Sequence, residues 1–262
     1  MAKVIAVYNK KGGCGKTTTA TTLAYLLARC GKRTALIDLD SQGDSSLAYG
    51  VPNPDKLQTT ILSLVKQVII GEPLPSPSSY MYSYHGVDLV PSNEEISTLE
   101  RNLSNVDFRE YILKEYISQI SPSYDYIIID TPPALNILTV NCYVASDYII
   151  IPMLAEILSL SGVIKIRETI QAVQESFNPR LKVLGILMTR NITRLNLSKE
   201  VEEMASDLSA LFNTRIFTTR IRNGVSTAEC PAHGKPVQFY APRSNPGKDY
   251  TAFVQEVFTI LK

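Results

Sequence analysis

The stretch Lys3–Thr18, KVIAVYNKKGGCGKTT, starts as an apolar run, continues as a glycine-rich loop and ends where a helix-favouring segment begins. Its glycines let the backbone wrap closely around a polyphosphate, so that successive N–H groups point inward. The first turn of the helix adds the positive end of its dipole. This order of strand, loop and helix predicts a phosphate loop. The residues expected to contact its nucleotide are Lys11, Gly12, Gly13, Cys14, Gly15, Lys16, Thr17 and Thr18.

Two side chains of the loop have roles that follow from their positions. Lys16 is placed to reach the β- and γ-phosphates, and the hydroxyl of Thr17 is placed to ligate Mg²⁺. Lys10 stands where the general pattern G-x-x-x-x-G-K-[ST] has its first glycine. The loop is therefore a deviant form of the Walker A motif, and ATP with Mg²⁺ is the expected cofactor pair.

Further along the chain, two apolar strands end in carboxylates of the kind that phosphoryl transfer uses. Tyr126–Asp130 (YIIID) has the Walker B arrangement, in which Asp130 holds Mg²⁺ through water. Leu36–Asp40 (LIDLD) ends the second strand with Asp38 and Asp40 on the same side of the backbone. One of these two carboxylates is expected to support the Mg²⁺ shell and the other to orient the attacking water.

Short apolar runs alternate with helix-period segments along the whole chain, which is the pattern of a mostly parallel sheet covered by helices. The runs are rich in Val, Ile and Leu, as expected of strands buried on both faces. No linker or repeat divides the chain, so we expect one doubly wound α/β domain over residues 1–262. The expected strands are Lys3–Tyr8, Arg33–Asp38, Val87–Val90, Tyr126–Asp130, Tyr148–Pro152, Lys182–Thr189 and Arg215–Thr218. The expected helices are Lys16–Cys30, Thr60–Ile70, Asn93–Leu103, Phe108–Ile120, Leu135–Ala145, Leu160–Phe177, Leu197–Phe212 and Asp249–Leu261.

Two segments have no clear periodicity. Gly71–Tyr84 is rich in Pro and Ser and is expected to be a surface excursion whose tyrosines pack on the body of the domain. A phosphorylation cluster is the alternative for those tyrosines. Asn223–Gly247 is rich in Gly, Pro and basic residues and is expected to be a long functional loop.

Composition narrows the class of protein. The net charge is only +1, but Arg180–Lys248 contains 11 Lys and Arg against 5 Asp and Glu, so the basic excess is local. The four cysteines lie far apart, without metal-ligand spacing, which favours reduced thiols in a cytoplasmic protein. No apolar run is long enough to span a bilayer, and a cleavable signal would remove the strand that the loop needs.

The motifs together resemble the deviant Walker A ATPases of the ParA/MinD superfamily, and within it the small Soj-like ParA proteins that segregate plasmids and chromosomes. The resemblance is carried by Asn9–Ser46, Tyr124–Asp147, Leu184–Ser198 and Ile221–Val237. It implies an ATPase that forms a sandwich dimer with ATP, binds DNA nonspecifically and is stimulated by a ParB-like partner bound to a centromere-like site. It also implies a cytoplasmic, nucleoid-associated protein.

The same resemblance assigns roles to individual residues. Lys11 matches the signature lysine, which crosses the dimer to the phosphates bound by the other subunit. Asp40 matches the water-orienting aspartate, Asp38 its partner, and Asp130 the Walker B aspartate. Asn191 is a candidate for adenine contact. The candidates for DNA contact are Arg190, Arg194, Arg215, Arg220, Arg222, Lys235, Arg243 and Lys248, with Arg220 and Arg222 preferred.

Two features depart from the family pattern. Ser41 replaces the proline that is usual in D-x-D-P-Q, and Cys14 occupies a variable loop position that is usually aliphatic. A thiol at a helix N-terminus is expected to have a lowered pKa and to be open to oxidation or alkylation.

Three other functions are compatible with a deviant phosphate loop. A MinD-like membrane-positioning ATPase would need an amphipathic helix beyond the last helix, whereas the apolar stripe of Asp249–Leu261 is needed to dock that helix on the body. An iron–sulfur reductase would need two cysteines per subunit at the dimer face, and only Cys142 is a candidate. A cargo-positioning relative would use the same ATPase cycle on a protein complex.

Overall fold

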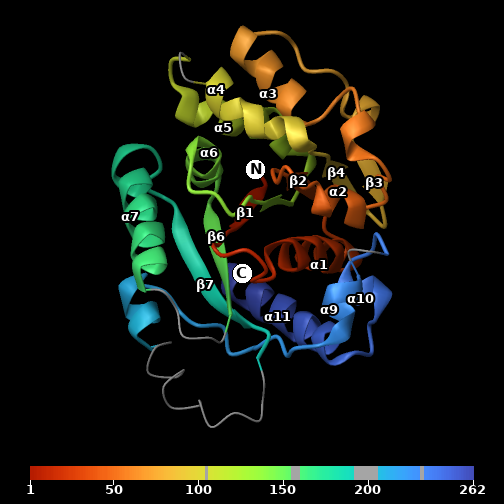
Figure 1. The fold of residues 1–262 in the computed structure, drawn as a ribbon, viewed down its shortest axis with the longest axis vertical. Coiled ribbons are helices and arrows are strands. Elements are labelled where there is room, and N and C mark those ends of the chain that lie inside the picture. The colour runs from red at the N-terminus through yellow and green to blue at the C-terminus, as the bar shows by residue number, and fades with distance from the viewer. Residues whose placement is uncertain (104–105, 155–159, 192–205, 231–232) are drawn as a thin grey trace.

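A computed structural model describes residues 1–103, 106–154, 160–191, 206–230 and 233–262 of the chain (Figure 1). In these ranges seven strands form one sheet in the order β3-β4-β2-β5-β1-β6-β7. All neighbours are parallel except β3 and β4, which form an antiparallel pair at one edge. The strands are β1 (Lys3–Val7), β2 (Thr34–Asp38), β3 (Tyr82–Tyr84), β4 (Val87–Val90), β5 (Tyr126–Asp130), β6 (Tyr148–Leu154) and β7 (Lys182–Thr189).

Helices cover both faces of the sheet, as the continuous apolar strands predict. Buried residues of α3, α5, α6 and α7 form one core with one face, and those of α1, α2, α10 and α11 form a second core with the other. The two layers are visible above and below the sheet in Figure 1. The bounds are α1 (Lys16–Arg29), α2 (Asp44–Ala48), α3 (Ile61–Ile70), α4 (Leu99–Asn102), α5 (Ile112–Ile120), α6 (Ile137–Ala145), α7 (Leu160–Ser176), α9 (Val225–Glu229), α10 (Val237–Tyr240) and α11 (Asn245–Leu261).

This arrangement confirms the expected α/β fold with a mostly parallel, doubly wound sheet. Loops that leave the carboxyl ends of parallel strands meet at one edge of the sheet, which is where such folds bind ligands. Asp38 is the last residue of β2 and Asp130 the last residue of β5, and the two lie in register. Val7, the last residue of β1, is in register with Asp130 as well. The phosphate loop and both carboxylates are therefore neighbours.

Several boundaries differ from the sequence-based expectations. The segment expected as a strand at Arg215–Thr218 makes only an isolated bridge between Ile216 and Ile186. The expected helix at Asn93–Leu103 is a 3₁₀ helix followed by the short α4. For the expected helix at Leu197–Phe212, residues 192–205 lie outside the described ranges, and residues 206–211 are helical.

The two segments without periodicity contain secondary structure. β3 lies inside the expected surface excursion, where Tyr80 is buried and the ring of Tyr84 packs on Tyr49 at 5.8 Å between centroids. The tyrosines thus pack on the body, although Tyr82 stays exposed. The expected long loop at Asn223–Gly247 was wrong in part, because it contains α9, α10 and the first turn of α11.

The last helix packs on the body of the domain. Its apolar stripe, Tyr250, Phe253, Val254, Val257 and Leu261, is buried against the sheet and α1. α11 begins four residues earlier than expected because the Ser244 hydroxyl caps it, accepting a hydrogen bond from the Gly247 N–H at 3.1 Å. None of the helices in the described ranges has the length and apolar content needed to cross a membrane.

Candidate nucleotide site

The phosphate loop joins β1 to α1 with two residues in the left-handed backbone region. Gly13 has φ 70° and Gly15 has φ 88°, conformations that a side chain makes costly. The loop is tied to the neighbouring strands at both ends. The Asn9 amide donates to Pro152 O at 2.7 Å, and the Thr189 hydroxyl donates to Cys14 O at 2.9 Å. The loop is thus held in shape by β6 and β7, which is the preorganisation that a phosphate cradle needs.

The two lysines of the loop have different surroundings. Lys16 is buried, and its ammonium donates to Lys11 O across the loop at 3.3 Å. It therefore points back over the cradle in which phosphates would lie. The side chain of Lys11 is exposed, while its backbone N–H donates to the Asn9 side chain at 3.0 Å.

Asp38 and Asp130 are both fully buried, and each is held by a serine of α2. The Asp38 Oδ2 atom accepts from the hydroxyl of Ser46 at 2.7 Å and from its N–H at 2.8 Å. The Asp130 Oδ2 atom accepts from the hydroxyl of Ser45 at 2.8 Å. Burial raises the pKa of both carboxyls. A neighbouring carboxylate raises each pKa further: Asp130 acts on Asp38, and Asp40 acts on Asp130. A bound cation would reverse that effect.

The geometry around Asp130 fits Mg²⁺. Its Oδ1 atom is buried and has no hydrogen-bond partner among the described residues. The hydroxyl of Thr17 acts on the same carboxylate and lowers its pKa. A buried carboxylate oxygen without a donor, next to a threonine hydroxyl, is the oxygen-rich arrangement that Mg²⁺ takes in nucleotide sites. Thr17 and Asp130 are therefore suitable metal-side residues, with Asp38 beside them.

Asp40 follows the strand end and lies in the wall of the cavity. Its N–H donates to Asp38 Oδ1 at 3.0 Å, and its own Oδ1 accepts from the Gln42 N–H at 3.1 Å. The cavity measures about 230 Å³. It is lined by Gly12, Gly13, Gly15, Lys16, Thr17, Thr18, Asp40, Asp44, Pro133, Thr189, Arg190, Ile221, Arg222, Thr227 and Tyr250. The structure thus brings most of the predicted loop residues together with Asp40.

The predicted adenine contact and two of the predicted DNA contacts lie beside this cavity. Asn191 bridges to Arg222 through the backbone, next to the lining residues but not among them. Arg222 makes a two-point ion pair with Asp249, with distances of 2.6 and 2.9 Å, and lines the cavity. Arg190 is exposed, has φ 51° and lines the cavity as well. Arg222 and Arg190 thus face the nucleotide site.

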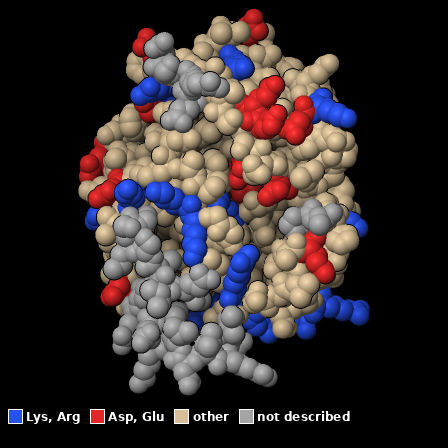
Figure 2. Space-filling model, in the orientation of Figure 1, with Lys and Arg blue, Asp and Glu red and all other residues tan. Residues whose placement is uncertain are grey.

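The other predicted DNA contacts are distributed over the C-terminal part. Arg243, Lys248 and Arg215 are exposed, whereas the ammonium of Lys235 lies 5.5 Å from the ring centre of Phe239. Arg194 lies outside the described ranges. Figure 2 shows basic side chains gathered across the middle and lower parts of this face, with a group of acidic ones above them.

The expectation for Cys14 was wrong. Its side chain is fully buried, and burial raises the pKa of the thiol, an effect larger than the lowering by Lys16. Cys142 is fully buried in the core on the α6 face. No group of metal-binding side chains that includes these cysteines occurs in the described part of the chain.

Sequence reasoning missed several residues that complete the site. Ser45 and Ser46 bond the two strand-end carboxylates, Thr189 bonds the phosphate loop, and Asp249 bonds Arg222. Only the two serines carry a sequence signal, because they follow Asp40 closely. The others become neighbours through the fold alone.

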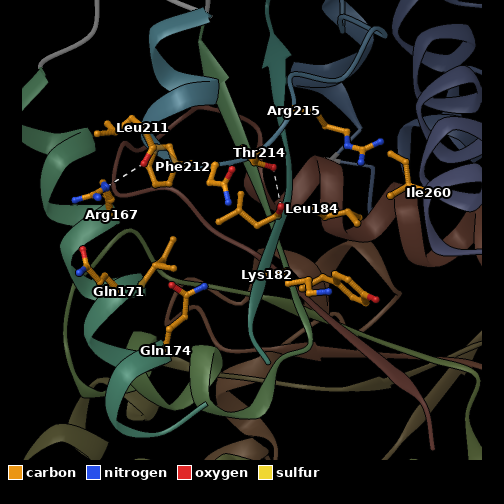
Figure 3. A pocket seen from close by; sticks show the side chains of 14 residues that line it. Arg167, Gln171, Gln174, Lys182, Leu184, Leu211, Phe212, Thr214, Arg215 and Ile260 are labelled. Carbon is orange, nitrogen blue, oxygen red and sulfur yellow. Dashed lines mark hydrogen bonds between the residues drawn. The ribbon is translucent and has the colours of Figure 1, made fainter. Parts of the chain in front are cut away.

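A second, larger cavity of about 800 Å³ lies between α7, the amino-terminal part of β7 and residues 211–215 (Figure 3). It includes Tyr148 and Lys182, the first residues of β6 and β7, so it lies at the sheet edge opposite the phosphate loop. Arg167 donates to Leu211 O at 2.9 Å, and the Thr214 hydroxyl donates to Val183 O at 2.7 Å. Arg215 is the one predicted site residue among those that line it.

Comparison with known proteins agrees with this geometry. Residues 2–183 match a family model described as an AAA domain. The chain is 34% identical to chromosome partitioning protein ParA of Caulobacter vibrioides, over 98% of this chain and 94% of that protein. It is 34% identical to sporulation initiation inhibitor protein Soj of Bacillus subtilis, over 98% of each chain.

The fold is also similar to that of a solved structure, cobyrinic acid a,c-diamide synthase from Mycobacterium smegmatis with bound ATP analog and magnesium. The TM-score is 0.84 at 30% identity, and the match covers 100% of this chain and 96% of that one. The matched family, the full-length relatives and the phosphate loop with its two strand-end carboxylates lead to one conclusion: the chain belongs to the ParA/Soj family of P-loop partition ATPases.

Proposed function

We propose that residues 1–262 form one ATPase domain that binds ATP with Mg²⁺, dimerises as a nucleotide sandwich and hydrolyses the ATP slowly. The observation that carries this proposal is that Lys16, Thr17 and Asp40 line one cavity. The strand-end carboxylates adjoin it, because Asp38 accepts from the Asp40 N–H and is the register partner of Asp130. Catalysis of phosphoryl transfer is mostly positioning and charge stabilisation. The residues that supply both lie together here.

Each part of the site has a separate task. Lys16 and the loop N–H groups bind the phosphates, and Thr17, Asp38 and Asp130 form the side that receives Mg²⁺. The cation, when bound, neutralises charge on the phosphate oxygens. Asp40 orients the attacking water, because it lies in the wall of the same cavity and its backbone is fixed on Asp38.

Lys11 makes hydrolysis depend on a second subunit. Its side chain is exposed at the edge of the loop, as a residue that acts on a neighbouring molecule must be. Charge that develops on the γ-phosphate is then stabilised only when two ATP-loaded subunits meet. Dimerisation and hydrolysis are thereby coupled.

Dimerisation also controls DNA binding in this proposal. The exposed basic residues of the C-terminal part contact DNA phosphates, and a dimer doubles the number of contacts. Of the predicted contacts, Arg243 and Lys248 remain the best placed because both are exposed, whereas Arg222 is paired with Asp249 and Lys235 is half-buried beside Phe239. Arg190, Arg194 and Arg220 remain candidates. A ParB-like protein bound to a centromere-like site stimulates hydrolysis, after which the ATPase dimer separates into monomers that release DNA. The ATPase is therefore cytoplasmic and associated with the nucleoid.

A membrane-positioning role receives no support from the last helix. Its apolar stripe is buried in the domain, so the helix has no matching face left for a bilayer.

The test measures DNA affinity with ATP, with ADP and without nucleotide, by fluorescence anisotropy of a labelled duplex of arbitrary sequence. ATP should increase the affinity, and rising salt should weaken it steeply. Lys16→Ala should abolish the ATP response. Asp40→Ala should stop hydrolysis but keep the ATP dimer and its DNA affinity. The proposal fails if ATP leaves DNA affinity unchanged in the wild-type protein.

A further inference from the structure

Helix α2 places two adjacent serines on two carboxylates that come from different strands. Ser45 bonds Asp130 at the end of β5, and Ser46 bonds Asp38 at the end of β2. All four side chains are fully buried. A buried hydroxyl that donates to a carboxylate fixes the orientation of that carboxylate, since no water competes for it.

The bond from Ser45 distinguishes the two oxygens of Asp130. Oδ2 receives the serine hydroxyl, whereas Oδ1 has no hydrogen-bond partner among the described residues. The χ2 torsion of an aspartate is broad and roughly two-fold, so a carboxylate without such a donor turns easily. The donor on Oδ2 therefore leaves Oδ1 as the oxygen available to a cation or its water.

Asp38 is held by more contacts than Asp130. It accepts both the hydroxyl and the N–H of Ser46, and its Oδ1 accepts the Asp40 N–H at 3.0 Å. Removing one hydroxyl would leave Asp38 oriented by two backbone donors. The carboxylate of Asp130 is acted on by side-chain hydroxyls instead, that of Ser45 at 2.8 Å from Oδ2 and that of Thr17.

We propose that Ser45 is a positioning residue for Mg²⁺, which it serves by holding Asp130 with Oδ1 turned to the metal. This inference rests on the proposed function, because it requires that Mg²⁺ binds with ATP at this site. Ser45 is not among the residues that line the cavity, so it acts through Asp130. Loss of a donor that orients a metal-side ligand typically weakens metal affinity by 10–100-fold.

The experiment is a MgCl₂ titration of the purified protein with a fluorescent, non-hydrolysable ATP analogue. Half-saturation by Mg²⁺ is compared for the wild type, Ser45→Ala and Ser46→Ala, the last as the matched control. Affinity for the analogue is also measured in EDTA, where the metal has no part. Circular dichroism melting checks that each variant is folded.

Ser45→Ala should raise the Mg²⁺ concentration at half-saturation by about tenfold and leave the affinity in EDTA unchanged. Ser46→Ala should raise it much less. Ser45→Cys, which is similar in size but a weaker donor, should give an intermediate value, and it replaces Ser45→Ala if the alanine variant does not fold.

An unchanged half-saturation in Ser45→Ala overturns the inference, and so does an equal loss of affinity with Mg²⁺ and in EDTA, which would indicate a purely structural role. Failure of the proposed function looks different, because the wild type itself would then show no Mg²⁺-dependent binding of the analogue.

Discussion

Asp38 and Asp130 are register partners at the ends of neighbouring parallel strands, and neither side chain is exposed to solvent. Two buried carboxylates side by side are unfavourable without a counter-charge, because burial disfavours the charged form of each. The raised pKa of each carboxyl reflects this cost. The apoprotein therefore keeps an arrangement that becomes favourable when a cation binds.

Neutralising one member of this pair should separate stability from metal binding. Asp130→Asn keeps an oxygen that can accept from Ser45 but removes a buried charge. We expect the free energy of unfolding in EDTA to rise by roughly 1–2 kcal/mol. Addition of Mg²⁺ and ATP should stabilise the wild type but no longer the variant, because a ligand raises the free energy of unfolding only of a protein that binds it. Urea unfolding with and without Mg²⁺ and ATP measures both effects, and an equal ligand-dependent gain in the variant would contradict the assignment.

The four cysteines should react at very different rates in the native protein. Cys30 is exposed, whereas Cys14, Cys142 and Cys230 are buried. Burial raises the pKa of the three buried thiols, so they are protonated and shielded at neutral pH. A colorimetric thiol reagent should titrate one thiol per chain rapidly and all four only in denaturant. Cys30→Ser should remove the rapid phase, and rapid labelling of Cys14 in that variant would show that its burial is wrong.

Arg222 and Arg243 should have separable functions. Arg222 lines the nucleotide cavity and is held by Asp249, whereas Arg243 is exposed outside the cavity. Arg222→Ala should therefore weaken nucleotide binding several-fold, as expected for the loss of a hydrogen-bonded charge at a site. Arg243→Ala should leave nucleotide binding unchanged and weaken DNA binding, with a smaller salt dependence. Isothermal calorimetry and the DNA anisotropy assay report these separately, and a change in nucleotide affinity in Arg243→Ala would argue against the division.

A methyl group at Gly185 of β7 should destabilise the packing between this strand and α11. A Cβ there would lie 2.7 Å from a ring carbon of Phe217, which is buried and packs edge-on against Phe253. Overpacking of this kind costs about 1–3 kcal/mol. Gly185→Ala should lower the melting temperature by several degrees. The double variant Gly185→Ala/Phe217→Leu should recover part of the loss, and failure to recover any would point to a backbone cause.

The sequence allowed prediction of those features that depend on local pattern. The six main strands, the phosphate loop and the strand-end aspartates each carry a continuous signal of a few residues. β3 was missed because it is a three-residue edge strand with one exposed and one half-buried tyrosine and no apolar run. α9 and α10 were missed because a Pro- and Gly-rich composition conceals single helical turns.

The parts of the site that escaped prediction depend on contacts between distant segments. Thr189 lies 175 positions from Cys14, and Ser45 lies 85 positions from Asp130. No periodicity encodes such pairs, because the fold brings them together. The burial of Cys14 is of the same kind. Its place at a helix N-terminus indicated a reactive thiol, but the folded chain buries the side chain completely.

Helix α2 has one more neighbour, at its carboxyl-terminal end. Gly234, in the C-terminal basic part, lies so close to Leu47 O that a Cβ would approach this oxygen to 2.9 Å. Ser46, which holds Asp38, and Leu47, which contacts the Gly234 loop, are thus consecutive residues of this five-residue helix. A substitution that shifts α2 would therefore move the serines that hold Asp38 and Asp130 and also the contact with Gly234. In the course of divergence, the two surfaces are therefore constrained to change together.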